Sequence, residues 1–212
     1  MLETFKKSSQ QLLDLLFPSL CVHCRRAGSL LCQRCTESIG ILKIEKNADK
    51  NQILCAASYD NPVARKAITS LKYDGLQGLD GHIAELMNKF LKQNGIEFKN
   101  HEVITYVPMH KDKEVFRGFN QARLIAEKLA ALTGLPCFPL LTKLRRTPSQ
   151  MLLNRDQRLN NLFGVFESKN CEGENIILID DVTTTGTTLK ECEKELYQAG
   201  AASVTCFAFA RD

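Results

Sequence analysis

Apolar residues in this chain fall into two kinds of pattern. The first is a short unbroken run, typical of a strand with both faces buried. The second is a recurrence every three or four residues, typical of a helix with one buried face. The strands predicted in this way cover residues 53–59, 103–107, 137–141, 162–166, 176–179 and 203–209. The predicted helices cover residues 1–17, 61–71, 80–94, 120–132 and 188–198.

Strands and helices alternate along most of the chain. Such alternation implies an α/β fold with a mainly parallel sheet and helices on both faces. Polar segments separate the elements, among them a loop expected over 108–118 and a turn over 171–174. We expect this α/β domain to occupy residues 51–212 and a small N-terminal unit to occupy residues 1–50.

The most informative segment is 176–188. Four apolar residues lead there into Asp180 and Asp181, and open α/β sheets bind ligands at the carboxyl ends of such strands. The loop that follows offers hydroxyls and backbone N–H groups just before a helix, which suits a phosphate monoester. With the carboxylates on ribose hydroxyls, the whole segment suits a sugar phosphate. The candidate ligands are Asp180, Asp181, Thr183, Thr184, Thr185, Gly186, Thr187 and Thr188.

Residues 176–188 resemble, position for position, the phosphoribosyl pyrophosphate (PRPP) motif of type I phosphoribosyltransferases. A strand, a threonine-rich turn and a helix cap without any ligand is the plainer alternative. Two acids at a buried strand end are costly without a partner, which favours the ligand site. The segment is not a Walker loop, because no Gly-Lys-Ser/Thr sequence follows the strand.

A PRPP site must also hold a pyrophosphate and a Mg²⁺ ion. The segment after the strand 103–107 carries Lys111, Lys113 and Arg117, and a basic loop after a parallel strand can bind a diphosphate. A plain surface loop followed by an Asn120 helix cap is the alternative. Further candidates for the rim of the site are Lys72 and Tyr73.

The net charge of +4 is concentrated in residues 143–158. This window holds the single acid Asp156 and also a proline, which indicates an exposed basic loop rather than a helix face. It is a candidate mobile hood over the pyrophosphate, a candidate site for the backbone of single-stranded DNA, or merely a solvated surface. The DNA-binding candidates are Lys143, Arg145, Arg146, Arg155 and Arg158.

Nine cysteines are many for 212 residues. Five stand singly and suit small core positions, whereas Cys21, Cys24, Cys32 and Cys35 form two C-x2-C pairs. Two such pairs can complete a tetrahedron around Zn²⁺ and leave no open position, so the site would be structural. The metal would organise residues 18–40. A redox pair of disulfides and an iron–sulfur cluster are the alternatives.

The composition is that of a soluble globular protein, with 44% hydrophobic and 25% charged residues. No run approaches the roughly 20 apolar residues that a membrane span needs. The N-terminus lacks the pattern of a signal peptide. We therefore expect a cytoplasmic protein.

Several motifs, in order along nearly the whole chain, resemble those of ComF-type proteins. They are Leu15–Pro18, the four cysteines, Leu71–Gly75, Val107–His110, Arg117–Gln121, Thr147–Gln150, Arg155–Asn161 and the PRPP motif. The resemblance implies a zinc knuckle fused to a phosphoribosyltransferase-like domain. It also implies a part in natural transformation, in which incoming single-stranded DNA is handled in the cytoplasm and other DNA-uptake proteins are candidate partners.

Three functions are compatible with this sequence. The first is a competence protein that binds PRPP and single-stranded DNA. The second is an active phosphoribosyltransferase, in which Mg²⁺ and basic groups neutralise the leaving pyrophosphate while ribose 5-phosphate passes to a base or an amine. The third is an adaptor that docks a partner through the knuckle. Family membership alone does not decide between them, because a fold can outlive its reaction.

Overall fold

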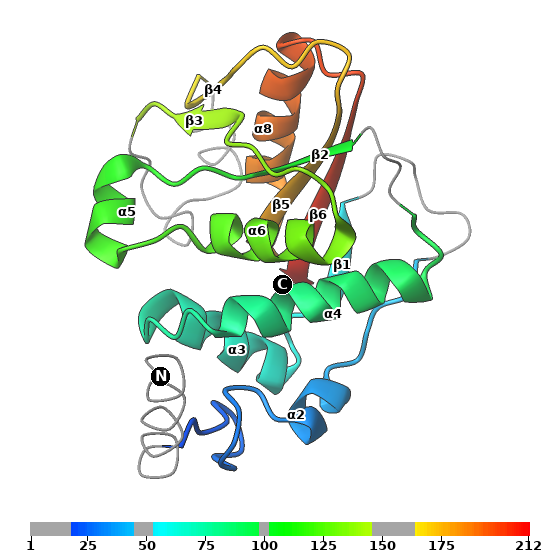
Figure 1. Cartoon of the computed structure of the whole chain (residues 1–212). Coiled ribbons are helices and arrows are strands. Elements are labelled where there is room, and N and C mark those ends of the chain that lie inside the picture. Colours follow the sequence, from blue (N-terminus) through cyan, green and yellow to red (C-terminus); the bar gives the residue numbers. More distant parts are fainter. Residues whose placement is uncertain (1–17, 45–52, 98–101, 146–163) are drawn as a thin grey trace, which may run out of the picture.

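The computed structural model describes residues 18–44, 53–97, 102–145 and 164–212. At its centre is a four-stranded sheet in the order β1-β6-β5-β2, in which every neighbouring pair is parallel (Figure 1). This confirms the α/β fold predicted from the alternating elements. The strands are β1 (Leu54–Ser58), β2 (Glu102–Tyr106), β5 (Asn175–Thr183) and β6 (Ser203–Arg211).

Helices cover both faces of this sheet. On one face lie α4 (Leu79–Gln93) and α6 (Gln121–Thr133), with α3 (Pro62–Tyr73) packed against α4. The opposite face is covered by α8 (Thr187–Gln198) (Figure 1). The other elements are α2 (Gln33–Ser38), α5 (Lys111–Arg117) and an antiparallel pair formed by β3 (Leu141–Lys143) and β4 (Phe166–Ser168).

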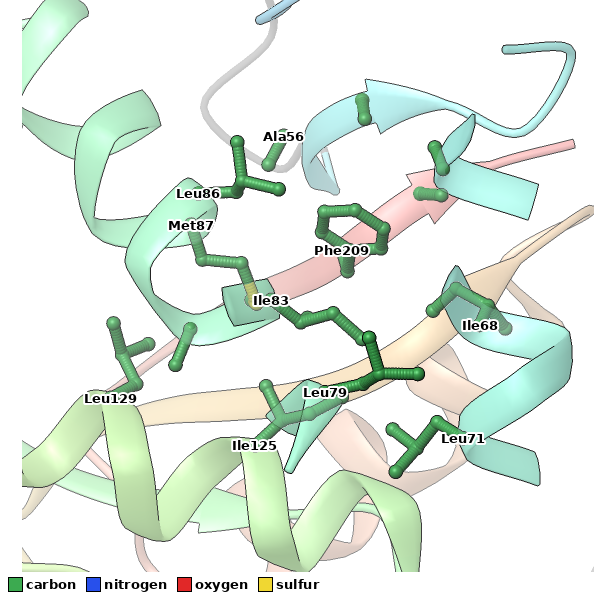
Figure 2. Close-up of a cluster of buried hydrophobic side chains, with 14 of the residues drawn as sticks. Ala56, Ile68, Leu71, Leu79, Ile83, Leu86, Met87, Ile125, Leu129 and Phe209 are labelled. Atoms are coloured by element: carbon green, nitrogen blue, oxygen red, sulfur yellow. The ribbon is translucent and has the colours of Figure 1, made fainter. Parts of the chain in front are cut away.

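The strand β5 shows why its apolar run does not alternate with polar residues. Ile177 and Ile179 belong to the core beneath α4 and α6, whereas Ile176 and Leu178 belong to the core beneath α8. Both faces of the strand are therefore buried, and each such side chain contributes roughly 1.5–3 kcal/mol. Figure 2 shows the larger core, which includes Ile68, Leu71, Leu79, Ile83, Leu86, Met87, Ile125, Leu129 and Phe209.

Two asparagine caps fix the helices that flank the sheet edge. The Asn61 side chain accepts hydrogen bonds from the N–H groups of Val63 and Ala64 at the start of α3. The Asn120 side chain caps α6 in the same way and donates a hydrogen bond to the carbonyl oxygen of Val107, 3.1 Å away. Asn120 thus ties the end of β2 to the start of α6, as expected of a helix cap.

The structure corrects three of the predicted segments. The expected loop 108–118 contains the helix α5. In the expected strand 137–141, Cys137 makes an isolated bridge to Ile104, and pairing resumes only in β3. The expected strand 162–166 is displaced, because β4 begins at Phe166. Both β3 and β4 are three residues long and bury one residue fully, so neither has a clear apolar run.

Other predicted elements lie close to their expected places. The helices α3, α4, α6 and α8 and the strands β1, β2 and β6 overlap the segments predicted for them. The helix predicted over residues 1–17 lies outside the described residues. Within the described ranges, no helix has both the length and the apolar character needed to cross a membrane.

Candidate functional site

The two acids of the 176–188 segment lie inside β5, which continues to Thr183. At the carboxyl end of this central strand, Asp181 Oδ1 is 2.9 Å from Lys72 Nζ in the last turn of α3, and both side chains are largely buried. Burial by itself lowers the pKa of Lys72, but the charge and hydrogen bond of Asp181 outweigh burial and raise it. The lysine is therefore held in its charged form against the acidic pair.

The environment of Asp180 disfavours the ionised form of its carboxyl group. Burial and the adjacent Asp181 carboxylate together raise its pKa to about 7, although Lys72 and Lys143 act in the opposite direction. Two neighbouring carboxylates in a partly buried place resist a second negative charge until a cation or a hydrogen-bond donor compensates them. The pair is thus prepared to receive such a group.

The charge pattern predicted that Lys143 lies in an exposed loop, and the structure shows that it does not. It ends β3, is half-buried, and has its Nζ 5.4 Å from the centre of the Phe166 ring on β4. Burial lowers its pKa and the positive charge of Lys113 lowers it further, while Asp180 acts in the opposite direction. Lys143 therefore stands within electrostatic range of Asp180, and Lys113 within range of Lys143. Of the other predicted DNA ligands, Arg145 is exposed, and Arg146, Arg155 and Arg158 lie outside the described residues.

The threonine-rich loop joins β5 to α8 at the same edge of the sheet. The Thr183 side chain is buried, whereas Thr184 and Thr185 are exposed, and Thr185 Oγ1 lies 2.7 Å from Thr187 Oγ1. Gly186 has φ +77°, and a Cβ atom at this position would overlap Ile53 Cδ1. The N-cap residue of α8 is Gly186, which has no side chain to cap the helix. The N–H groups of a first helical turn point out of the start of the helix, which here adjoins the exposed hydroxyls.

The second basic segment forms α5 rather than a loop. His110 caps this helix at its start, and Gly118, with φ 86°, ends it. Lys111 and Lys113 are exposed, and the Arg117 guanidinium stands 5.4 Å from the centre of the Tyr73 ring. Because Tyr73 follows Lys72 at the end of α3, this contact brings the end of α5 beside the acidic pair.

The four N-terminal cysteines gather into one cluster. Their sulfur atoms all lie within 4.8 Å of one another, and Cys24 Sγ is 3.5 Å from Cys32 Sγ. In a tetrahedral Zn²⁺ site the sulfurs would be about 3.8 Å apart, so the cluster fits a metal ion of this size. The N–H of Cys32 donates to Cys21 Sγ, which favours the thiolate form that a metal requires. The remaining five cysteines are also free thiols, and most are buried.

The cluster is attached to the α/β domain through a shared core. Cys21, Leu31, Cys35 and Ile39 pack in the same core as α3 and α4. Three polar contacts add to this attachment. They are Ser29 Oγ with His82 Nε2 at 3.2 Å, Asn61 Nδ2 donating to the Ser38 oxygen at 2.9 Å, and the Ile44 N–H donating to Asn94 Oδ1 at 2.9 Å.

The structure brings most of the predicted ligands to one edge of the sheet. Lys72, a rim candidate, is in direct contact with the acids. Lys143, a DNA-binding candidate, lies near Asp180. No local pattern could reveal either position, because each depends on how distant elements pack. The sequence analysis made no prediction for Phe116, which lay in a segment expected to be a loop and is exposed on α5.

Comparison with known proteins gives relatives named as competence proteins and as DNA utilization proteins. No family model matches the chain. The chain is 33% identical over 159 residues to Competence protein ComFC of Bacillus subtilis. The matched stretch covers 71% of this chain and 61% of that protein. It is 29% identical over 198 residues to Competence protein F of Haemophilus influenzae. This match covers 90% of this chain and 84% of that protein. The chain thus spans less than two thirds of the length of the Bacillus relative.

A solved structure with a similar fold is the glutamine PRPP amidotransferase of B. subtilis in complex with ADP and GMP. The TM-score is 0.42 and the identity 20%, over 76% of this chain and 32% of that one.

The parallel sheet, with its acidic strand end leading into a threonine loop and α8, is the arrangement that the sequence led us to expect of a phosphoribosyltransferase-like α/β domain. In this chain it is preceded by a four-cysteine cluster. The two relatives narrow the comparison further, because this chain is similar to two proteins that are both named as competence proteins.

Proposed function

We propose that the carboxyl edge of the sheet binds PRPP together with Mg²⁺. In this proposal Asp180 and Asp181 hold the ribose hydroxyls, and the loop and first turn of α8 hold the 5-phosphate through hydroxyls and N–H groups. Basic side chains on α3 and α5 balance the charge of the pyrophosphate. These side chains are Lys72, Lys111, Lys113 and Arg117.

One observation carries this proposal. Asp181 of the acidic pair contacts Lys72 at the end of the central strand, and the start of α8, with Gly186 as its N-cap residue, follows the pair in the chain. A sugar phosphate offers hydroxyl donors for the acids and a phosphate for the helix, so its two ends match the two halves of the site. Carboxylate oxygens are also the ligands that Mg²⁺ prefers in proteins, and the ion commonly keeps substrate phosphates as its other ligands.

Calorimetric titration of PRPP in the presence of Mg²⁺ tests the proposal. The double variant Asp180→Asn, Asp181→Asn should bind PRPP roughly 10- to 100-fold more weakly than the unmodified chain, since it loses charged hydrogen bonds. Glu174→Gln is a matched control, because Glu174 is an exposed acid just before the opposite end of β5. Equal affinities for the double variant and the control would refute the assignment.

We further propose that the four cysteines hold a structural Zn²⁺ ion, one per chain. A Zn²⁺ ion and its four thiolate ligands together carry a net charge of −2. The neighbouring Arg25, Arg26 and Arg34 offset this charge. With four sulfur ligands the ion has no open position for chemistry, so its contribution is to hold the N-terminal unit together. Elemental analysis should give one zinc per chain, and iron in its place would contradict the proposal.

The biological role that we propose is a cytoplasmic one in natural transformation, with PRPP and incoming single-stranded DNA as ligands. The names of the two relatives support a competence role. The basic residues of the 143–158 segment support contact with a nucleic-acid backbone. In this role residues 1–50 form the metal-bearing unit and residues 51–212 the ligand-binding domain, and other DNA-uptake proteins are candidate partners.

An active phosphoribosyltransferase is the alternative for the same site. The positions of Lys72 and Lys143 beside the acidic pair favour it, since positive charge there would stabilise a leaving pyrophosphate. Pyrophosphate release across a panel of bases and amines separates the two functions. Release that requires an acceptor and fails in the double acid variant indicates transfer. PRPP binding without release indicates a binding protein.

A further inference from the structure

The outer surface of α5 carries apolar groups that the fold does not use. Phe116 is 93% exposed and Val115 is 84% exposed, and no residue of α5 is buried. Tyr73, at the end of α3, is 70% exposed although the Arg117 guanidinium stacks on its ring. A large apolar side chain left in water forgoes the gain of burial, so a group of such residues indicates a binding surface.

The charges around these rings are mainly positive. Lys111, Lys113 and Arg117 lie on the same short helix as Phe116. Of its two acids, Glu114 pairs with Arg123 at 3.6 Å, whereas Asp112 is exposed and its N–H donates to His110 Nδ1. Protein–protein interfaces are depleted of lysine at their centres, whereas exposed aromatic rings among cations are typical of surfaces that bind single-stranded nucleic acid.

We propose that Tyr73 and Phe116 form a stacking platform for the bases of single-stranded nucleic acid, with Arg117 between α3 and α5 as a contact for the backbone. This inference deepens the DNA-binding part of the proposed function and does not depend on PRPP binding. It assigns base contacts to α3 and α5, whereas the 143–158 segment was a candidate for backbone contacts alone. Because stacking uses the face that every base shares, binding has little sequence preference.

The platform lies next to the acidic pair. Tyr73 follows Lys72, whose Nζ contacts Asp181, and Lys113 stands within electrostatic range of Lys143. Positively charged groups therefore extend from α5 to the sugar-phosphate site. A nucleic-acid strand on the platform would pass beside that site, and the two ligands would meet at one edge of the sheet.

Fluorescence anisotropy with a labelled oligothymidylate of roughly 15 nucleotides tests the platform. Phe116→Ala and Tyr73→Ala should each weaken binding about 5- to 100-fold. Phe138→Ala is a control, because Phe138 is also a half-exposed aromatic residue but lies outside α3 and α5. Thermal unfolding of each variant checks that the fold is intact. This check does not involve PRPP, so the result can be interpreted whether or not PRPP binds.

Two further measurements separate base stacking from protein docking and from contacts to the nucleic-acid backbone. The chain has no tryptophan, so Phe116→Trp introduces a single reporter that should retain affinity and be quenched by the oligonucleotide. Phe116→Leu should lose affinity, although a protein-docking surface would accept it. An abasic strand of the same length should bind the unmodified chain and Phe116→Ala equally weakly.

The proposal is overturned if the aromatic variants bind the oligonucleotide as well as the control does. It is also overturned if the introduced tryptophan is not quenched at saturation. Binding lost only on neutralising Arg145, Arg146, Arg155 and Arg158 would place the nucleic acid on the 143–158 segment and leave α5 as a surface for a protein partner. Failure of PRPP to bind would affect none of these results.

Discussion

Among single residues, the balance of charge around the acidic pair explains most of the site. Lys72 compensates Asp181 directly, with 2.9 Å between the charged atoms. Asp180 accepts a hydrogen bond from the N–H of Asp181 at 2.8 Å, yet its pKa is raised from 3.8 to about 7 by burial and by the Asp181 carboxylate. The free protein therefore holds one carboxyl group whose ionisation is unfavourable. A ligand that donates hydrogen bonds or brings a cation would relieve that cost.

The raised pKa of Asp180 predicts a pH dependence of stability. Since the folded-state pKa lies above the ordinary value, the folded protein binds more protons than the unfolded chain between about pH 4 and pH 7. Stability contributed by this group is therefore present at low pH and is lost as the pH rises toward 7. Asp180→Asn removes the charge, so at pH 8 it should raise the free energy of unfolding by on the order of 1 kcal/mol.

Urea unfolding at several pH values measures this effect. The difference between Asp180→Asn and the unmodified chain should shrink as the pH falls from 7 toward 4. The Glu174→Gln control should show no comparable trend. A stabilisation of equal size at pH 4 and pH 8 would mean that Asp180 is not the titrating group.

At the scale of elements, the junction between β5 and α8 depends on one glycine. Gly186 has φ +77° and also lies against the Ile53 side chain, so a Cβ atom there meets both backbone strain and a steric overlap. Gly134, which ends α6, has the same φ of 77° but open space around it. A comparison of substitutions at the two glycines therefore distinguishes the cost of backbone strain from the cost of steric crowding by Ile53.

Replacing these glycines by alanine tests the junction. Gly134→Ala should cost about 1–2 kcal/mol from backbone strain alone. Gly186→Ala should cost more, by about 1–3 kcal/mol, because Ile53 must also move. Ile53→Val removes the contacted Cδ1 atom, so in that background the cost of Gly186→Ala should fall toward the Gly134→Ala value. Chemical denaturation of the four variants measures all of these differences, and equal costs at both glycines would disprove the crowding.

Sequence reasoning succeeded where an element carries its own signal and failed where it does not. The run Ile176–Ile179 predicted β5 because both faces of the strand are covered. The helix α5 was missed because none of its residues is buried, so it has no apolar periodicity and depends on the His110 cap and Gly118. The contact between Lys72 and Asp181 joins distant parts of the chain, and no local pattern encodes it.

For the whole molecule, the N-terminal cysteine cluster and the ligand site are linked through one core. The sequence indicated that a metal would organise residues 18–40. In the structure Cys21 and Cys35 pack in the core that includes Ile68 and Leu71 of α3. The next residue of that helix is Lys72, which contacts Asp181. Loss of the metal should therefore disturb more of the chain than the cluster itself.

Removal of the metal tests this linkage. Cys35→Ser, or treatment with a chelator, should lower the melting temperature of the whole chain, since metal binding contributes to folding. It should also weaken PRPP binding, because α3 loses part of its support. Cys171→Ser is the control, because Cys171 is a buried cysteine in the separate core beneath α8. Two independent unfolding transitions, with PRPP affinity unchanged, would contradict the linkage.

The most direct test of the account is to map where PRPP binds. Titration of PRPP with Mg²⁺ into ¹⁵N-labelled protein should shift the amide resonances of Asp181, Lys72 and Thr184–Leu189. Resonances at the opposite edge of the sheet, such as those of Glu174 and Ala202, should stay in place. Saturable shifts at the carboxyl edge, absent in the Asp180→Asn, Asp181→Asn variant, are the predicted result. No shifts at saturating PRPP, or shifts confined to another surface, would contradict the site described above.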